Sequence, residues 1–400
     1  MNNVAKVKDC LGCGVCSLKC VKQAILMQYN VFGQSVPKVE KAICANCGKC
    51  IQFCPTCKQK HMTEKNIKKA YIAVNNNTDV LKKSASGGVA AALAYYWIMQ
   101  GGSVCGACGV SPRSIKERFH VEHILIHEVM DIEKIQGSKY VQSDIIKVLP
   151  IIEKQLKEGK RILFFGTSCQ VDAVKTYLGR EYENLNTVDL ICHGVIGSKM
   201  FDSYLRSIEL KEGNRLLNVS FRTKEKEMPY TFTFTFTDEN NNTYVKELHK
   251  NKSSYYRMFL GCIGYRKSCY RCKYANIDKP ADITLGDYYE AVDDYPELFE
   301  NNKFDMQRGI SSVIIHNKKG MNLLNSSDIS TYLVDTQKVV NSHVQLQHPS
   351  RAKRGSAIIM ALYRVLGWKG VNLFYRMFDI IAFFLERLIN SGKMLGKKWG

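Results

Sequence analysis

The chain has 400 residues, of which 45% are hydrophobic and 24% charged, a composition typical of a folded globular protein with two or three domains. Residues 1–6 contain no apolar run, and the longest apolar run near the end, residues 380–385, is far shorter than the roughly 20 residues that cross a bilayer. We therefore expect no signal peptide and no spanning helix, and a cytoplasmic location. A cytoplasmic protein can also contact a membrane surface, and this alternative stays open.

The formal net charge is +20, which would suit a nucleic-acid partner. The basic residues are scattered along the chain, however, and anionic clusters or phosphate-bearing cofactors would absorb part of the charge. No nucleic-acid partner is therefore expected. Of the 16 cysteines, nine fall within the first 57 residues, which in a cytoplasmic protein indicates metal ligands rather than disulfides.

The N-terminal cysteines form two copies of the run Cys-x2-Cys-x2-Cys-x3-Cys. This is the bacterial ferredoxin spacing, in which three thiolates wrap one four-iron cluster and the fourth ligates the other cluster. Zinc normally takes two cysteine pairs with a long spacer, which does not match. Two 4Fe-4S clusters are thus expected, one on Cys10, Cys13, Cys16 and Cys54, the other on Cys20, Cys44, Cys47 and Cys50. Cys57 has no place in the repeat and is expected to be a packing residue.

Patterns of hydrophobic residues and turns predict the elements that follow. Short strands are expected at 24–27 and 35–39, a linker at 58–69, and a helix over 89–96. Strands are predicted at 104–110, 121–127, 161–165 and 187–191, with an amphipathic helix at 144–158 between them, which indicates α/β architecture. Residues 231–237 alternate Thr and Phe, and with a turn at 238–242 and a return at 244–248 they predict a hairpin.

Several cysteines beyond residue 57 are candidates for a third cluster. Cys169 and Cys192 each follow a predicted strand, and Cys269 and Cys272 lie in a polar, turn-like stretch. Cys262 competes for one of these places, and isolated core thiols are the simpler alternative.

Another pair, Cys105 and Cys108, lies on the predicted strand 104–110. Residues three apart on a strand face opposite sides of the sheet and cannot share a metal, so we expect both to be small buried thiols.

Two loops have the residues of a phosphate or cofactor site. Ser84-Ala85-Ser86-Gly87-Gly88 leads straight into a predicted helix, whose first backbone N–H groups are open to a phosphate. The stretch 166–170 follows a predicted strand, where α/β sheets usually bind ligands. The chain has no G-x-G-x-x-G, so an ordinary nicotinamide-binding Rossmann site is unsupported.

Together these stretches resemble the coenzyme F-420 hydrogenase/dehydrogenase beta subunit family, over about residues 1–325. The resemblance is to bacterial members with a fused N-terminal ferredoxin, often met among surface-polysaccharide genes. Ser168 and Lys267 stand where the family usually has proline, next to candidate cluster cysteines. The matching stretches are 86–88, 137–143, 166–170, 189–194, 221–222, 268–272, 282–287 and 309–320.

The resemblance implies an iron–sulfur flavoprotein with FAD, which passes electrons between a hydride carrier, such as coenzyme F-420, and its clusters. A flavin can connect two-electron hydride transfer with one-electron cluster chemistry. The residues expected to contact flavin or its phosphates are Ser86, Gly87, Gly88, Gly166, Thr167 and Gln170. Those expected to supply charge or hydrogen bonds near flavin or substrate, the candidate catalytic residues, are Lys139, His193 and Arg222.

The predicted fold is an α+β ferredoxin-like module (bacterial 2x4Fe-4S), then an α/β flavin-binding body with a mixed sheet, then an α-helical tail. The expected regions are 1–60, 70–150, 155–340 and 355–400. The predicted function is an oxidoreductase, with a hydride-carrying coenzyme or redox protein as partner and a place in surface-polysaccharide biosynthesis. The alternative is a non-catalytic electron-transfer subunit that feeds a partner enzyme. A third class, structural clusters on a nucleic-acid surface, would lack flavin.

The C-terminal segment 371–389 predicts a helix with a narrow polar stripe on an otherwise apolar surface. Two readings stay open. The helix packs on the protein's own core, or it contacts an anionic membrane or a partner, which the basic end of the chain would favour. The stripe comprises Asn372, Arg376, Asp379, Glu386, Arg387 and Asn390.

Overall fold

The computed structural model describes residues 2–58, 68–110, 119–222, 230–300 and 304–396. The linker expected at 58–69 lies largely outside these residues. Within them, no helix is long and apolar enough to cross a membrane.

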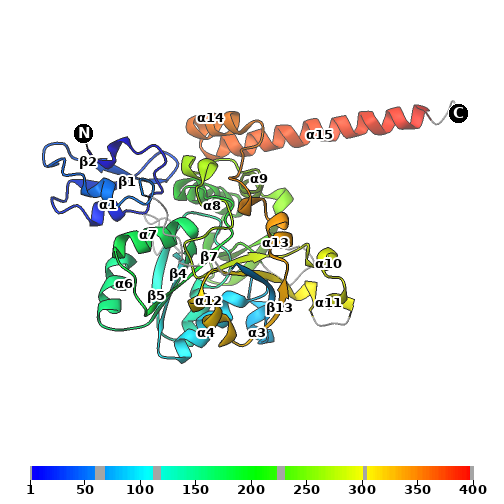
Figure 1. The fold of residues 1–400 in the computed structure, drawn as a ribbon. Coiled ribbons are helices and arrows are strands. Elements are labelled where there is room, and N and C mark those ends of the chain that lie inside the picture. The colour runs from blue at the N-terminus through cyan, green and yellow to red at the C-terminus, as the bar shows by residue number, and fades with distance from the viewer. Residues whose placement is uncertain (1, 59–67, 111–118, 223–229, 301–303, 397–400) are drawn as a thin grey trace.

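The N-terminal module is a small unit beside the body (Figure 1). Its two strands, β1 (Ile25–Tyr29) and β2 (Ser35–Val39), pair antiparallel as predicted, with Ile25 opposite Val39. Gly14 and Gly48, at equivalent positions of the two cysteine runs, adopt φ of +75° and +76° and start the two short helices α1 and α2. A side chain is strained at such φ values, so glycine permits both turns. The helical segments are η1 (Val4–Lys6), α1 (Val15–Leu18) and α2 (Lys49–Gln52).

The body is built on an eight-stranded mixed sheet in the order β13-β3-β12-β11-β7-β6-β4-β5. Strands β4, β6, β7 and β11 run parallel, so their carboxyl ends meet at one edge, while the outer strands pair antiparallel. The predicted α/β body with a mixed sheet is therefore confirmed. The strands are β3 (Lys69–Asn75), β4 (Ser103–Val110), β5 (His120–Ile126), β6 (Ile162–Thr167), β7 (Leu185–Leu190), β11 (Ile283–Asp287), β12 (Ser311–Ile315) and β13 (Ile329–Val334).

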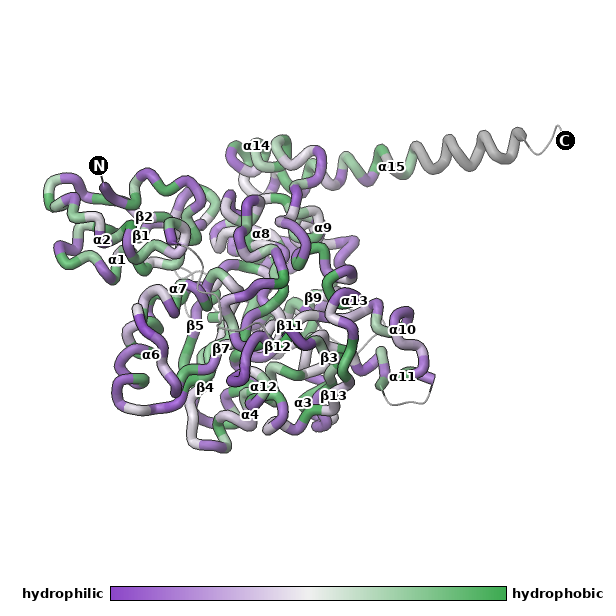
Figure 2. The backbone as a smooth tube through the Cα atoms, in the orientation of Figure 1, coloured by the Kyte–Doolittle hydropathy of each residue, from purple (hydrophilic) through white to green (hydrophobic). Residues whose placement is uncertain are grey.

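Helices cover both faces of this sheet and each face has its own core. On one face α4 packs with α5 and α12, and on the other α6 packs with α7. Figure 2 shows both hydrophilic and hydrophobic residues along α6, as expected of an amphipathic surface helix. The helices and 3-10 turns of the body are α3 (Thr78–Lys82), α4 (Val89–Met99), η2 (Val129–Asp131), α5 (Ile132–Ile135), α6 (Val148–Lys157), α7 (Ser168–Leu178), α10 (Ala291–Asp294), α11 (Glu297–Glu300), η5 (Met306–Arg308), α12 (Lys318–Asn325), α13 (Thr336–Ser342) and η6 (Val344–Leu346).

The helix predicted at 144–158 begins later, at Val148. Asp144 instead pairs with Glu122 of β5 in an isolated bridge, and its carboxylate accepts a hydrogen bond from the backbone N–H of Ile146. This local alternative to a helical turn delays the helix.

A second sheet, with the order β10-β9-β8, holds an aromatic core. The predicted hairpin is present, and Phe232, Phe234 and Phe236 all point inward from β9, at most 1% exposed. Each contributes roughly 2 kcal/mol by burial. The elements are α8 (Ser198–Glu212), β8 (Arg215–Ser220), β9 (Thr231–Thr237), β10 (Thr243–His249), η3 (Lys250–Lys252), α9 (Ser254–Leu260) and η4 (Lys267–Arg271).

The helical C-terminal region comprises α14 (Ser356–Leu366) and α15 (Trp368–Gly396). Trp368, Val371 and Tyr375 are buried against the aromatic core, so the start of α15 belongs to the fold. Figure 1 shows α15 then running away from the body. Along this part Phe378 and Ile381 are 56% and 55% exposed. The side chains of Glu386, Arg387 and Asn390 lie outside the described residues.

Candidate functional site

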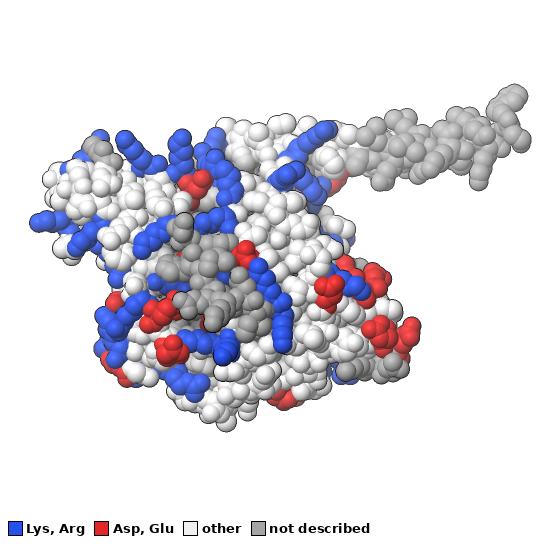
Figure 3. Space-filling model, viewed as in Figure 1, with Lys and Arg blue, Asp and Glu red and all other residues white. Residues whose placement is uncertain are grey.

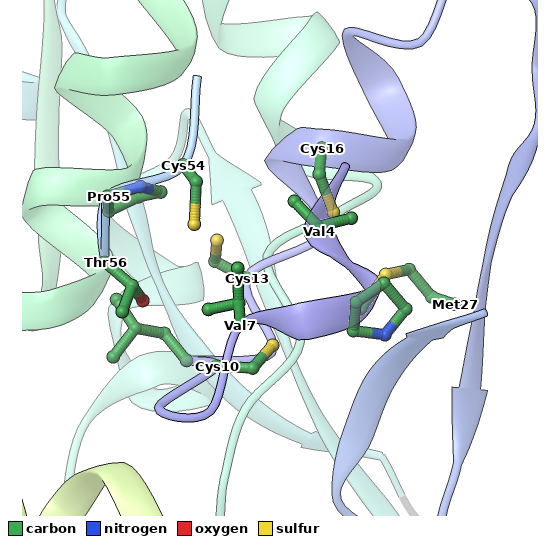
Figure 4. Close-up of a pocket in the computed structure, with 12 residues that line it drawn as sticks. Val4, Val7, Cys10, Cys13, Cys16, Met27, Cys54, Pro55 and Thr56 are labelled. Carbon is green, nitrogen blue, oxygen red and sulfur yellow. The ribbon is translucent and has the colours of Figure 1, made fainter. Parts of the chain in front are cut away.

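The first group of thiols surrounds a small cavity in the N-terminal module. Cys10, Cys13, Cys16 and Cys54 line it together, and Figure 4 shows the sulfur atoms of Cys13 and Cys54 pointing toward each other. These are the four residues that the ferredoxin spacing assigns to one cluster. Burial, together with the nearby thiols of Cys10 and Cys54, raises the pKa of the Cys16 thiol to about 12. The structure thus brings Cys54, which is distant in sequence, to the first run.

The second group, Cys20, Cys44, Cys47 and Cys50, is less enclosed. Cys50 is buried and Cys47 is exposed. Burial and the charge of Cys44 both raise the pKa of Cys50. The Cys20 sulfur accepts a hydrogen bond from the N–H of Ala24 at 3.3 Å. This side of the module faces solvent.

A third group of thiols lies in the body, where the parallel strands end. Cys169 starts α7 directly after β6, Cys192 follows β7, and Cys269 and Cys272 lie on and just after η4. Burial raises the pKa of Cys192 well above its ordinary value, and the thiols of Cys269, Cys169 and Cys272 each raise it further. The same coupling links Cys169 to Cys272 and Cys269. We call these four residues the body thiols.

The remaining cysteines do not belong to these groups, although the Cys57 side chain interacts with that of Cys54. Cys262 adopts a φ of +53° and packs against the aromatic core. Its charge raises the pKa of Tyr265 and Tyr270, and it is not among the main causes that raise the pKa of Cys169, Cys192 or Cys269. Cys105 is buried, as expected, and Cys108 is half-buried on the same strand. The expectation that Cys57 is a packing residue is wrong, because its side chain is exposed near the end of the module.

The donor set fits iron–sulfur clusters better than single ions. Across the described part of the chain, no three His, Cys, Asp or Glu side chains are gathered tightly enough to hold one metal ion. The thiols instead line cavities, as the ligands of a larger cluster do. Burial raises the pKa of Cys169 to about 12 and that of Cys269 to about 11, so the metal-free thiols are protonated at neutral pH. A bound metal would displace these protons.

A cavity of about 520 Å³ lies at the carboxyl ends of the parallel strands. Its volume is within the usual range for small-molecule and cofactor sites. All four body thiols line it, and so does Cys13 of the N-terminal module. We call this space the central cavity. It adjoins two groups of thiols at once.

The serine–glycine loop lies on one wall of the central cavity, which Ser86, Gly88 and the first residues of α4 line. Gly88 precedes α4 with a φ of +71°, and no side chain caps the helix. The first backbone N–H groups of α4 therefore have no intrahelical acceptor, which fits an anionic group such as a phosphate. Gly87 also has a packing reason, because a Cβ there would lie 2.5 Å from the carbonyl oxygen of Ala73.

The second loop is held by its own hydrogen bonds. Thr167 and Gln170 form a capping box at the start of α7, with the Thr167 N–H donating to Gln170 Oε1 at 2.9 Å. The Gln170 amide donates to Ser143 Oγ at 2.9 Å. Both side chains line the central cavity, as does Gly166, where a Cβ would lie 2.7 Å from the Phe164 ring. The loop thus presents a rigid, polar wall.

Lys139 lines the same cavity. Burial lowers the pKa of its ammonium group to about 8, and Cys108 partly opposes this. Its Nζ donates to the carbonyl oxygens of Ile135 and Gln136, each at 2.8 Å. Since an ammonium group has three N–H bonds, one stays available for a group in the cavity.

His193 and Arg222 also lie on the wall of the central cavity. Burial lowers the pKa of His193, and His343 lowers it further, so His193 is neutral at pH 7. The Arg222 guanidinium donates to Asp287 Oδ2 at 2.8 Å and to the Tyr289 hydroxyl at 2.7 Å. Burial acts to lower the pKa of Arg222, but Asp287, Tyr140 and Tyr289 together outweigh it and the pKa is raised. Arg222 is therefore a permanent, firmly held charge.

Three wall residues were missed in the sequence: His123, Arg266 and His343. Burial lowers the pKa of His123 to about 4, so its ring is neutral. Its Nε2–H donates to the Phe165 carbonyl oxygen at 2.9 Å, and its buried Nδ1 has no partner among the described residues. A buried acceptor without a partner on a cavity wall fits a bound ligand that donates to it. No sequence pattern marks this residue within its strand.

Comparisons with known proteins agree with this arrangement. Residues 70–150 match the family described as "Coenzyme F420 hydrogenase/dehydrogenase, beta subunit N-term", and residues 159–339 match its C-terminal counterpart. A search of curated proteins finds no match. Among solved structures, a chain of the xenon-derivatised F420-reducing [NiFe] hydrogenase complex from Methanosarcina barkeri is 17% identical. The match covers 72% of this chain and 96% of that one, with a TM-score of 0.41, too low to carry an argument on its own. By the two matched regions, this chain belongs to the coenzyme F420 hydrogenase/dehydrogenase beta subunit family.

Proposed function

We propose that this protein is an FAD-dependent iron–sulfur oxidoreductase with three 4Fe-4S clusters. The observation that carries the proposal is the central cavity, whose wall combines the body thiols, Cys13, the uncapped start of α4 and three cationic side chains. The cations, Lys139, Arg222 and Arg266, suit a phosphate-bearing, electron-accepting ligand. FAD bound there would exchange a hydride with a carrier and single electrons with the clusters.

The positions of the thiols give the order in which electrons would pass between the flavin and the clusters. The body thiols line the central cavity directly, so their cluster would be the first to exchange electrons with a bound flavin. Cys13 lines both the central cavity and the small cavity of the module, so the first ferredoxin cluster would be next. The second ferredoxin cluster, with the exposed Cys47, would lie at the outer end. Residues 1–60 thus act, in this proposal, as a ferredoxin-type module.

The wall residues have distinct tasks in this proposal. Lys139 directs one N–H toward the ligand, and its lowered pKa lets it lose its charge slightly above neutral pH. His193, neutral and stacked 6.1 Å from the Phe259 ring, offers a hydrogen bond without adding charge. Arg222 fixes Asp287 and Tyr289 on the opposite wall. The loop residues Ser86 and Gly88 keep the start of α4 open to a phosphate.

The test is anaerobic reconstitution followed by cofactor analysis. We expect about twelve iron atoms and about twelve acid-labile sulfides per chain, together with one FAD. A screen of hydride donors, beginning with reduced coenzyme F420 and reduced nicotinamides, then identifies the carrier. A chain that binds zinc without sulfide, or no flavin, would refute the proposal.

The alternative function is an electron-transfer subunit without turnover of its own. Figure 3 shows Lys and Arg side chains gathered over the N-terminal module and the adjoining surface, with few acidic ones between them on this face. Such a surface suits an acidic redox protein as partner. Steady reduction of a dye by a hydride donor, with no second protein present, separates the enzyme from the subunit.

Two narrower proposals rest on other grounds. A role in surface-polysaccharide biosynthesis follows from the resemblance to bacterial members alone. A peripheral membrane contact is favoured by the exposed apolar side chains of α15, among them Phe378, Ile381 and Phe384, and by the basic residues around it.

A further inference from the structure

Arg266 is a buried cation at the junction of the N-terminal module and the body. Only 4% of the surface of Arg266 is exposed to solvent. Nη1 donates to the Cys10 carbonyl oxygen at 3.0 Å, and Nη2 donates to the Ser35 carbonyl oxygen at 2.9 Å. Nε and Nη2 both donate to Gln142 Oε1, at 3.1 and 2.8 Å. All of these acceptors are neutral, and no ion pair joins Arg266 to a carboxylate of the described residues.

Four cysteines lie around Arg266. Cys13, Cys169 and Cys269 line the central cavity together with it, and its Nη1 donates to the carbonyl oxygen of Cys10. Two of these belong to the first ferredoxin group, and two are body thiols. Arg266 therefore lies between two cluster sites and near both of them.

The chain on the module side is adapted to this cation. Gly12 adopts a φ of +71°, and a Cβ there would lie 2.4 Å from Arg266 Nη2. A buried guanidinium without a counter-ion is unfavourable, because its desolvation is not repaid. Thiolates that carry iron–sulfur clusters would supply the missing negative charge.

We propose that Arg266 is a positioning residue that provides one positive charge to both the body cluster and the first ferredoxin cluster, and so makes both easier to reduce. The proposal rests on the proposed function, since it requires both clusters. Each step between them moves a single electron, so that one cluster is oxidised as the other is reduced and no proton is needed. A fixed positive charge favours the reduced, more negative state of each cluster.

The experiment is an EPR-monitored redox titration of the reconstituted full chain, with iron and sulfide content measured on the same samples. Arg266→Gln removes the charge but keeps hydrogen-bond donors, whereas Arg266→Lys keeps the charge and loses the forked geometry. Arg271→Gln is the matched control, since Arg271 lies on the same segment, is 60% exposed and pairs with Asp9. All three variants are compared with the unaltered chain.

In Arg266→Gln we expect the reduced-to-oxidised ratio at a fixed potential to fall on the order of tenfold, which for one electron corresponds to about 59 mV. Arg266→Lys and Arg271→Gln should stay close to the unaltered chain. A fully loaded Arg266→Gln chain with unchanged potentials would overturn the proposal. So would equal shifts in the two glutamine variants, or loss of iron from Arg266→Lys as well as Arg266→Gln. An unaltered chain without clusters would instead refute the proposed function itself.

Discussion

Removing two body thiols is expected to remove one cluster and leave the other two in place. In Cys269→Ala with Cys272→Ala, both ligands contributed by the segment around η4 are lost. Cys169 and Cys192 alone cannot hold a four-iron cluster, which needs four thiolates. We therefore expect iron to fall from about twelve to about eight atoms per chain, with an equal fall in sulfide.

The structure also supports the expectation that the other two clusters keep their ligands. Burial is the largest cause of the raised pKa of Cys169 and persists after the substitution, so its thiol stays neutral at pH 7. A neutral thiol behaves as a small apolar side chain, and two shortened side chains on a cavity wall cost little packing. The small cavity between Cys10 and Cys54 has no wall residue in common with the replaced pair.

Cys262→Ala is the matched control for the cysteine pair. Cys262 is close in sequence and half-buried, but its thiol is not among the main causes that raise the pKa of Cys169, Cys192 or Cys269. Iron and sulfide should stay at the level of the unaltered chain. The reasoning is refuted if Cys262→Ala loses about four iron atoms, or if the double variant keeps all of its iron.

Three further predictions address the cavity and the tail. Ala90→Asp places a carboxylate in the first turn of α4, on the cavity wall, and should weaken FAD binding on the order of tenfold in a titration of the apoprotein. The neutral Ala90→Asn should not weaken it. Equal FAD affinities of the two variants would exclude this helix end as the phosphate site. Because Lys139 is charged below its pKa of about 8 and neutral above it, FAD affinity should fall as pH rises through about 8. Lys139→Arg should remove that pH dependence. If the FAD affinity of the unaltered chain did not change with pH, the role given to Lys139 would be wrong. The double variant Phe378→Ser, Ile381→Ser should no longer sediment with anionic vesicles, while the midpoint temperature of its thermal unfolding stays unchanged. An unaltered chain that does not sediment with these vesicles would disprove membrane contact.

The features that the sequence predicted well are those set by local spacing. The strands β1 and β2, the Thr–Phe alternation of β9 and the strand-then-turn pattern at β6 and β7 all depend on neighbouring residues. Their side-chain periods alone fix which face each residue presents. The body cysteines were predicted as a candidate set because two of them follow such strands, and the parallel strands then bring the strand ends together.

The features that were missed depend on contacts between distant segments. His123, Arg266 and His343 reach the central cavity from a strand, a loop and a helix end that no local pattern connects. The placement of Gly87 against β3 and β12 likewise depends on the long-range strand order. The start of α15 is also part of the core, and the polar stripe of the tail does not reveal that contact with the aromatic core.

The segment around η4 links cluster binding to domain docking. It carries two body thiols, and its cationic side chains hold the N-terminal module: Arg266 donates to the Cys10 carbonyl oxygen, Arg271 pairs with Asp9, and Lys273 donates to the Lys58 carbonyl oxygen at 3.1 Å. A bound cluster would fix this short 3-10 turn, because it is stabilised by few backbone hydrogen bonds of its own. Loss of the cluster should therefore loosen the junction as well. We expect the Cys269→Ala, Cys272→Ala chain to be cleaved by protease between module and body faster than Cys262→Ala, and equal cleavage rates would show that the module docks independently of the cluster.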